Sequence, residues 1–316
     1  MNDPIKLIGF PNTGLLVFHA GIEKGFFEKH GVLVELEVTP SSIYQLVNLI
    51  DGKFDIACGA VDNFIAYQEK AGEEIPKKEP DLCVFMGATQ IELSFVVAKE
   101  IQSFEDIRGT KLAMDALTTG FAFVLYRMLD DAGLSSDDYE MVSVGATPHR
   151  WAGVQSGEYS GTLLIEPFTG QARASGFKSL GSSRETFKNY PGQMFGAMRG
   201  WAAENRGKMV SFIKGYLDAL DWILDNKHTG EVEQLLVKHM PQIKRQAVGI
   251  ALSKLRSPDT GLVPRGVIDR EGLKTVLALR SQYAPQGQKL TDIERINLAY
   301  QLKRKLDFLN PDNLAK

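Results

Sequence analysis

Hydroxyl, amide and carboxylate side chains gather at turns that follow a short apolar run and open an amphipathic helix. One such turn spans residues 10–13, and a similar turn much later in the chain spans residues 115–121. The first N–H groups of a helix are free, and the helix dipole is positive there, so such turns bind hydrogen-bond acceptors and anions. Two turns of this kind, each starting a strand–helix–strand run, predict two similar lobes that hold a small molecule between them.

Further turns belong to the same prediction, because open α/β sheets bind ligands beyond the carboxyl ends of their strands. These turns span residues 60–63, 145–151 and 166–169. Each polar side chain could also be a plain helix cap, so only their convergence on one cleft would favour binding. With Glu92 added, the candidate ligand-binding residues are Phe10, Asn12, Thr13, Asp62, Asn63, Glu92, Asp115, Thr118, Thr119, Gly120, Phe121, Arg150, Glu166 and Phe168. We expect the cleft to lie between the turn at Asn12 and Thr13 and the turn at residues 118–120.

The aromatic and charged candidates indicate what kind of ligand would bind. Aromatic residues stand beside four of the turns, namely Phe10, Phe64, Phe121 and Phe168. An aromatic residue near a helix start is more often part of the hydrophobic core. Two or more such residues in the cleft would favour a ligand with a ring or an apolar body. Arg150 could clamp a carboxylate or sulfonate with two hydrogen bonds, or it could be an ordinary exposed arginine. This inventory favours a flat molecule with N–H or O–H donors, such as a substituted pyrimidine or an aromatic acid, over a bare oxyanion.

Several functions are disfavoured by what the sequence lacks. It has no nucleophile elbow, zinc-protease motif, Walker A motif or dinucleotide-binding glycine motif, and we expect no catalytic residues, metal or cofactor. The net charge is −3 and the basic residues are scattered, which argues against nucleic-acid binding. No apolar run reaches the length of a membrane span. Cys58 and Cys83 lie in apolar runs and are expected to be buried and free, although a disulfide between adjacent strands stays open.

Strands and helices alternate through the first two thirds of the chain, which predicts an α/β fold with mostly parallel sheets. The expected strands are 4–8, 32–38, 54–59, 82–86, 92–98, 111–114, 139–144, 162–165 and 193–198. The expected helices between them are 15–27, 41–50, 62–68, 120–131, 151–156 and 168–175. Apolar residues then recur at three- and four-residue steps from 205 to 226, and shorter helices follow.

This alternation predicts a discontinuous arrangement of two lobes. Residues 1–92 begin lobe one, residues 93–198 form lobe two, and residues 199–316 complete lobe one with helices. The strands near Phe95 and Met194 would carry the chain between the lobes. Two such crossings permit hinge closure about a central cleft.

Several segments, taken together, resemble type II periplasmic substrate-binding proteins. Residues 18–31 are similar to that family's A-x-x-x-G-F-F-x-x-x-G segment, and residues 45–60 contain its L-x-x-G-x-x-D-x-A pattern. Residues 106–112 resemble its D-L-x-G-K entry to the second lobe, and residues 201–222 resemble its later F-x-x-A-x-x-x-A-x-x-W helix, with Gly215 in place of the first alanine. The resemblance is to the branch that binds nitrate, sulfonates, taurine and thiamine precursors for ABC transporters.

The resemblance implies a two-lobed periplasmic-binding-protein type II fold with a helical C-terminal extension. It also implies a protein that captures a small organic molecule for an ABC permease. The sequence does not fix the oligomeric state, and a monomer is the default expectation. The alternative is a cytoplasmic enzyme on the same fold, such as an aromatic-acid decarboxylase, because Met1 is not followed by a signal sequence and acids and a histidine lie near the cleft. A ligand sensor is a third reading. The resemblance favours the periplasm, whereas a native start at Met1 would favour the cytoplasm.

Overall fold

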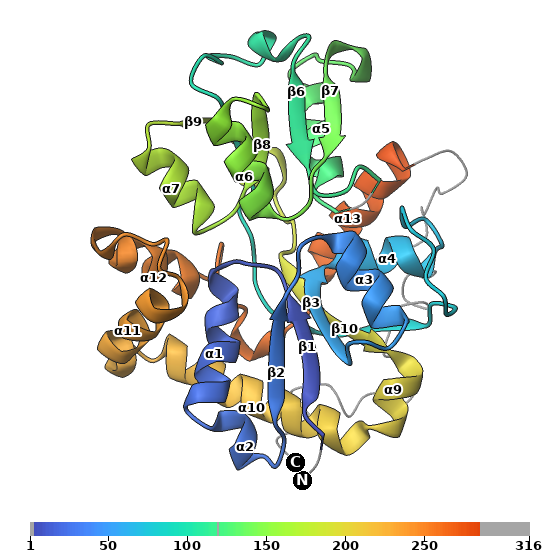
Figure 1. The fold of residues 1–316 in the computed structure, drawn as a ribbon, viewed down its shortest axis with the longest axis vertical. Helices are drawn as coiled ribbons and strands as arrows, with labels where there is room; N and C mark the ends of the chain where they lie inside the picture. Colours follow the sequence, from blue (N-terminus) through green and yellow to red (C-terminus); the bar gives the residue numbers. More distant parts are fainter. Residues whose placement is uncertain (1–2, 119, 285–316) are drawn as a thin grey trace.

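The computed structural model describes residues 3–118 and 120–284, which form two α/β lobes stacked one above the other (Figure 1). The sheet of lobe one has the order β2-β1-β3-β10-β4, and the sheet of lobe two has the order β7-β6-β8-β5-β9. Lobe one contains β1 (Ile5–Gly9), β2 (Val34–Val38), β3 (Ile56–Ala60), β4 (Leu82–Gly87) and β10 (Gln193–Met198). Lobe two contains β5 (Ser94–Val97), β6 (Lys111–Met114), β7 (Glu140–Ser143), β8 (Gly161–Leu164) and β9 (Lys178–Ser182).

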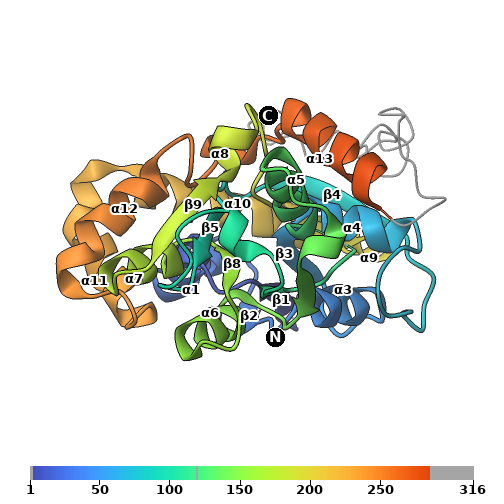
Figure 2. The ribbon, with the colours of Figure 1, turned by 90° about the horizontal axis from the view of Figure 1, so that it is seen from above.

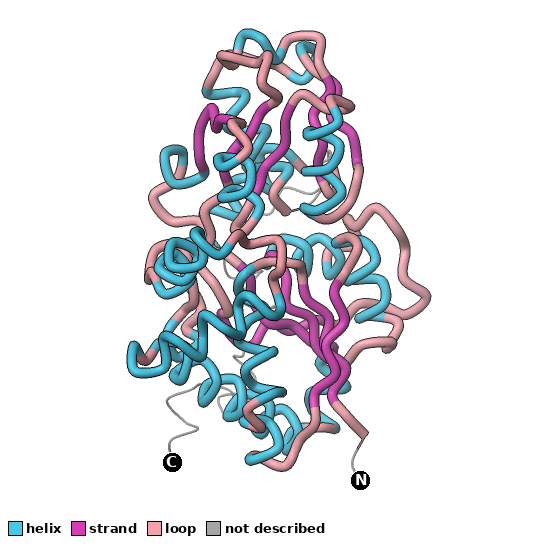
Figure 3. The backbone as a smooth tube through the Cα atoms, turned by 60° about the vertical axis from the view of Figure 1, so that its left-hand side comes forward, coloured by secondary structure: helices cyan, strands magenta, loops and turns pink. Residues whose placement is uncertain are grey.

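Each sheet is mostly parallel and has one reversed strand in its interior. Strand β10 pairs antiparallel with both β3 and β4, and β5 pairs antiparallel with both β8 and β9. In each lobe the reversed strand is the one by which the chain enters from the other lobe. The structure therefore differs from the sequence plan, because β10 belongs to the first sheet and not to lobe two. The crossing segments run side by side, and Gln90 of one pairs with Pro191 of the other (Figure 3).

Helices cover both faces of each sheet. Lobe two carries α5 (Ala122–Asp131), α6 (Thr147–Ser156), α7 (Phe168–Ala174) and α8 (Ser183–Thr186). Lobe one carries α1 (Leu16–Glu23), α2 (Phe26–Lys29), α3 (Ser42–Ile50) and α4 (Val61–Gln68). The chain after β10 adds α9 (Arg199–Glu204), α10 (Arg206–Leu224), α11 (Thr229–His239), α12 (Val248–Arg256) and α13 (Arg270–Tyr283). In the described part of the chain, no helix combines the length and apolar character needed to cross a membrane.

Local sequence explains most of these elements and their few departures from expectation. Ser41 caps α3 by accepting a hydrogen bond from the Tyr44 N–H at 3.0 Å. Gly25 adopts a left-handed conformation, with φ of 72°, which divides the single helix expected over 15–27 into α1 and α2. Strand β9 and helix α8 were not expected, because the half-exposed β9 has no clear apolar alternation. Cys58 and Cys83 are buried and free, as predicted.

Helix α13 lies between the lobes and packs against α4 of lobe one and α5 of lobe two (Figures 1 and 2). Arg280 of α13 is fully buried and forms an ion pair with Asp62 of α4 at 3.0 Å. The Arg280 guanidinium also lies over the ring of Phe123 in α5. One turn later, the Tyr283 hydroxyl donates to Asp130 of α5 at 2.5 Å. The chain that follows β10 therefore contacts both lobes.

A pair of stacked histidines joins α1 to α11. The rings of His19 and His239 are 3.7 Å apart between centroids, and Glu23 forms ion pairs with His239 and Lys238. Burial and the neighbouring His239 lower the pKa of His19 from 6.5 to about 4.

Acidification is therefore expected to destabilise this protein between pH 6.5 and about pH 4 through His19. In that window the unfolded chain binds a proton at His19 that the folded protein excludes, so stability is full above pH 6.5 and falls as the pH drops. With partial exposure taken into account, the loss should be about 1–2 kcal/mol. Urea unfolding of wild type and His19→Gln at several pH values in this window measures it. An equal slope in the two proteins would contradict the prediction.

Candidate functional site

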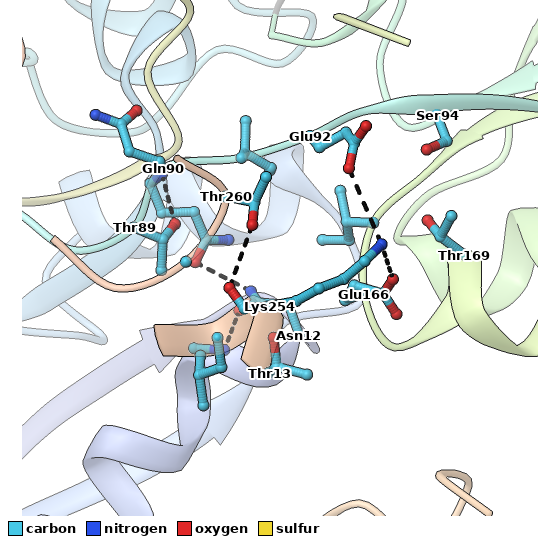
Figure 4. Close-up of a pocket in the computed structure, with 16 residues that line it drawn as sticks. Asn12, Thr13, Thr89, Gln90, Glu92, Ser94, Glu166, Thr169, Lys254 and Thr260 are labelled. Carbon is cyan, nitrogen blue, oxygen red and sulfur yellow. Dashed lines mark hydrogen bonds and ion pairs between the residues drawn. The ribbon is translucent and has the colours of Figure 1, made fainter. Parts of the chain in front are cut away.

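Two adjoining compartments lie between the lobes and share Ile165 and Gln193. Both are narrow, with cavity volumes of about 40 and 30 Å³. The Arg150 compartment is lined by Phe10, Ser42, Ala60, Asn63, Met114, Asp115, Ala116, Gly120, Phe121, Ala122, Thr147, Arg150, Ile165 and Gln193. The Lys254 compartment, drawn in Figure 4, is lined by Asn12, Thr13, Gly14, Thr89, Gln90, Ile91, Glu92, Ser94, Ile165, Glu166, Thr169, Gln193, Lys254, Leu255, Thr260 and Gly261.

Arg150 is a buried and firmly held cation, only 4% exposed. Its Nε donates to the Gly145 carbonyl at 3.0 Å, its Nη1 donates to Thr162 and to the Leu163 carbonyl, and its Nη2 donates to Thr147 at 3.1 Å. A guanidinium has five N–H donors, so these bonds leave one N–H on Nη2 for a ligand. Burial lowers the pKa of Arg150 to about 10, and the group stays charged at neutral pH. The two-bond clamp expected from the sequence would require Arg150 to release a protein partner.

Hydrogen bonds between the lobes lie beside the Arg150 compartment. Asp115 of lobe two accepts from the Ser42 N–H at the start of α3, at 3.0 Å. The Gly120 N–H of lobe two donates to Asp62 at the start of α4, at 2.5 Å. Burial raises the pKa of Asp115, and the nearby Arg150 opposes that shift. The structure is therefore a closed arrangement of the two lobes.

The Lys254 compartment contains an ion pair that crosses from one lobe to the other (Figure 4). Lys254 of α12 in lobe one reaches Glu166, just before α7 in lobe two, at 2.6 Å, and Glu92 at 4.0 Å. Glu166 also accepts from the Gly170 N–H through its carboxylate and from the Thr13 N–H through its carbonyl. Both carboxylates and the ammonium are partly exposed, so a ligand in this compartment would meet them directly.

Asn12 connects the two compartments from the lobe-one side. Its side chain accepts from the Gly14 N–H at 2.7 Å and donates to the Phe10 carbonyl at 2.9 Å and to Gln193 at 3.0 Å. Asn12 is thus a helix cap that also orients the amide of Gln193 in the wall common to both compartments.

Comparison with known proteins identifies the family to which this chain belongs. The model of the NMT1-like family matches residues 5–237. The chain belongs to the NMT1-like family. No curated protein matches the sequence well enough to count as a relative.

Solved structures share the fold of this NMT1-like protein at low sequence identity. The alkanesulfonate-binding protein SsuA from Xanthomonas axonopodis pv. citri, bound to MOPS, has a TM-score of 0.72 and 15% identity, over 95% of this chain and 99% of that one. The periplasmic nitrate-binding protein NrtA from Synechocystis PCC 6803 has a TM-score of 0.65 and 17% identity, over 74% and 65% of the two chains. A Candida albicans gene product with the generic periplasmic binding protein fold has a TM-score of 0.74 and 12% identity, over 95% and 96%. These findings confirm the predicted two-lobed fold. They also confirm the resemblance to the nitrate- and sulfonate-binding branch of type II periplasmic substrate-binding proteins.

The structure brings most of the predicted residues of the NMT1-like chain to the two compartments, but three described ones lie elsewhere. Asp62 is 1% exposed and is occupied by Arg280. The Thr118 carbonyl accepts from the same guanidinium at 3.4 Å, and its side chain lines neither compartment. Phe168 packs in the core of lobe two with Trp151. Thr119 lies outside the described residues.

The two turns expected to face each other line neighbouring compartments instead. Asn12 and Thr13 lie in the Lys254 compartment, whereas Gly120 lies in the Arg150 compartment beside Asn63. Sequence reasoning also missed Lys254 and Gln193. Lys254 stands on an ordinary amphipathic helix of the C-terminal region, where nothing local marks it. Gln193 opens a strand that the sequence plan assigned to the other lobe.

Proposed function

We propose that this NMT1-like protein binds a small organic molecule in the cleft between its lobes and delivers it to an ABC permease. The observation that carries the proposal is the side chain of Asn63, which lines the Arg150 compartment and is 4% exposed. Among the described residues its amide has no hydrogen-bond partner. The amide is reachable from the compartment and has both donors and an acceptor to offer, so it supports a ligand that hydrogen-bonds there.

The surroundings of Asn63 support a ligand with a flat apolar body. Phe10 comes from lobe one and Phe121 from lobe two, so a ring held between them would contact both lobes at once. Met114 and Ile165 add apolar surface, and one N–H of Arg150, which has no partner among the described residues, offers a site for an accepting group. This mixture of apolar lining and a few fixed polar groups is typical of small-molecule sites.

Ligand screening by thermal shift, followed by calorimetry, tests the proposal. A compound that binds only the native state raises the melting temperature by mass action. We expect aromatic acids or substituted pyrimidines to give saturable shifts, and nitrate or sulfate to give little. Turnover of such compounds without saturable binding would overturn the proposal, and so would tight binding of an inorganic oxyanion alone.

Replacement of Asn63 by alanine is expected to weaken ligand binding while leaving the unliganded fold almost intact. The substitution removes no hydrogen bond within the described protein but should remove one to the ligand, which contributes about 1–3 kcal/mol in a closed cleft. Calorimetry gives the affinity, and thermal unfolding without ligand gives the stability. Asn48→Ala, which removes an amide of α3 outside the cleft, should leave affinity unchanged. Normal binding by Asn63→Ala would show that this amide does not contact the ligand.

A further inference from the structure

The charged side chains that line the two compartments are unevenly distributed. In the Arg150 compartment one carboxylate, Asp115, faces one cation. In the Lys254 compartment two carboxylates, Glu92 and Glu166, face the single ammonium of Lys254. The ammonium is 2.6 Å from Glu166 but 4.0 Å from Glu92. Within the described residues, Glu92 therefore has no closer cation and no hydrogen-bond donor to its carboxylate.

A second observation in the same compartment points to a ligand. Thr169 is 7% exposed, and its hydroxyl has no hydrogen-bond partner in the part of the chain that the structure describes. Figure 4 shows Thr169 and Ser94 on the side of the compartment toward which the Lys254 ammonium extends. A buried hydroxyl without a partner is unfavourable, so the site is complete only when something bonds to it.

We propose, on the basis of the function proposed above, that the Lys254 compartment is a subsite for a protonated amino group of the ligand. The Glu92 carboxylate accepts one N–H of that group, and the Thr169 hydroxyl accepts another. Hydrogen bonds between an ammonium and a carboxylate are among the stronger ones in proteins. The rest of the ligand extends past Ile165 and Gln193, which border both compartments. It reaches Phe10 and Phe121, the two aromatic residues of the Arg150 compartment. The ligand is accordingly an amine-bearing aromatic molecule, cationic or zwitterionic.

An anionic group does not fit this compartment. Lys254 is already paired with Glu166, and an anion beside its ammonium would also lie near two carboxylates, which repel it. The subsite therefore separates this protein's ligand from the nitrate and alkanesulfonate for which two of its structural neighbours are named.

Three matched ring compounds test the subsite by calorimetry on the full chain: para-methylbenzylamine, para-(aminomethyl)benzoate and para-methylbenzoate. The two amines are expected to bind at least roughly tenfold more tightly than para-methylbenzoate. Glu92→Gln should reduce the affinity of the amines by roughly tenfold and leave that of para-methylbenzoate within about twofold. Glu100→Gln, which removes the same charge from an exposed position outside both compartments, should change neither.

Thr169→Val provides a test that does not depend on a charge change. It should lower the affinity of the amines several-fold and leave the melting temperature equal or higher, because it removes a hydroxyl with no partner among the described residues. A clear loss of stability would mean that the hydroxyl serves the fold, and would contradict the proposal.

The outcomes separate this inference from the function on which it rests. If para-methylbenzoate binds as tightly as the amines and Glu92→Gln has no effect, the amino-group subsite is wrong while the cleft remains a binding site. If none of the three compounds binds and the wider screen also gives no saturable binding, both the proposed function and the subsite are overturned.

Discussion

Replacement of Arg280 by methionine is expected to lower the free energy of unfolding by about 3–5 kcal/mol. Arg280 is fully buried, and its partner Asp62, 3.0 Å away, is 1% exposed. Without the guanidinium, the carboxylate would be buried with no counter-charge. Burial already raises the pKa of Asp62, and Arg280 opposes that shift. The substitution also removes the hydrogen bond from α13 to the Thr118 carbonyl.

A second substitution identifies the cause of that loss. Arg280→Met combined with Asp62→Asn should regain part of the stability, because asparagine still accepts from the Gly120 N–H but carries no charge. Arg127→Met, which breaks an exposed ion pair with Asp131 on α5, should cost no more than about 0.5 kcal/mol. Urea unfolding followed by circular dichroism measures all three variants. A double variant no more stable than Arg280→Met would show that lost packing, and not the unpaired carboxylate, is responsible.

Replacement of Gly120 by alanine is expected to weaken ligand affinity by roughly tenfold or more, in addition to a loss of stability. Gly120 has a φ of 59°, and a Cβ atom there would lie 2.7 Å from Oδ1 of Asn63 in the other lobe. The Asn63 amide, which lines the Arg150 compartment, would have to turn away from this contact and so would lose the position from which it can bind a ligand.

Gly133→Ala is the matched control for this variant. Gly133 lies in the same lobe with a φ of 80°, and a Cβ atom there would meet nothing within 4 Å. Both substitutions place alanine in a left-handed conformation, which costs about 1–2 kcal/mol. The contact with Asn63 is specific to Gly120. Calorimetry with the tightest aromatic compound of the screen should therefore show weakened binding only for Gly120→Ala. Equal affinities would mean that ligand binding tolerates the extra methyl group.

The local pattern of the sequence was enough to predict most elements, but not the sheet to which each strand belongs. The apolar run at residues 193–198 fits the interior of either sheet. Only its pairing with β3 and β4, strands that lie far away in the chain, places it in lobe one. Strand β9 was missed for a different reason, because a half-exposed strand shows weak alternation of apolar and polar residues.

The candidate site was predictable where strand ends position it and unpredictable where distant side chains decide it. Phe10, Asn63 and Arg150 follow from the rule that ligands bind beyond the carboxyl ends of strands. Asp62 satisfies the same rule, yet a cation 218 residues later in the chain occupies it. Lys254 enters the cleft only because α12 packs against the turn Thr13–Leu15. No local pattern could reveal either of these contacts.

The pairing of Gln90 with Pro191 has a consequence for how ligands enter. If the two crossing segments were independent, one lobe could rotate relative to the other, and either end of the cleft could open alone. Because the two crossing segments are hydrogen-bonded to each other, they act as one two-stranded hinge, which bends readily but resists twisting. Thr89, next to Gln90, pairs in turn with Leu262, which follows the helix that carries Lys254. Both compartments of the cleft should therefore open and close together. A molecule that spans them must then be enclosed in a single closing motion.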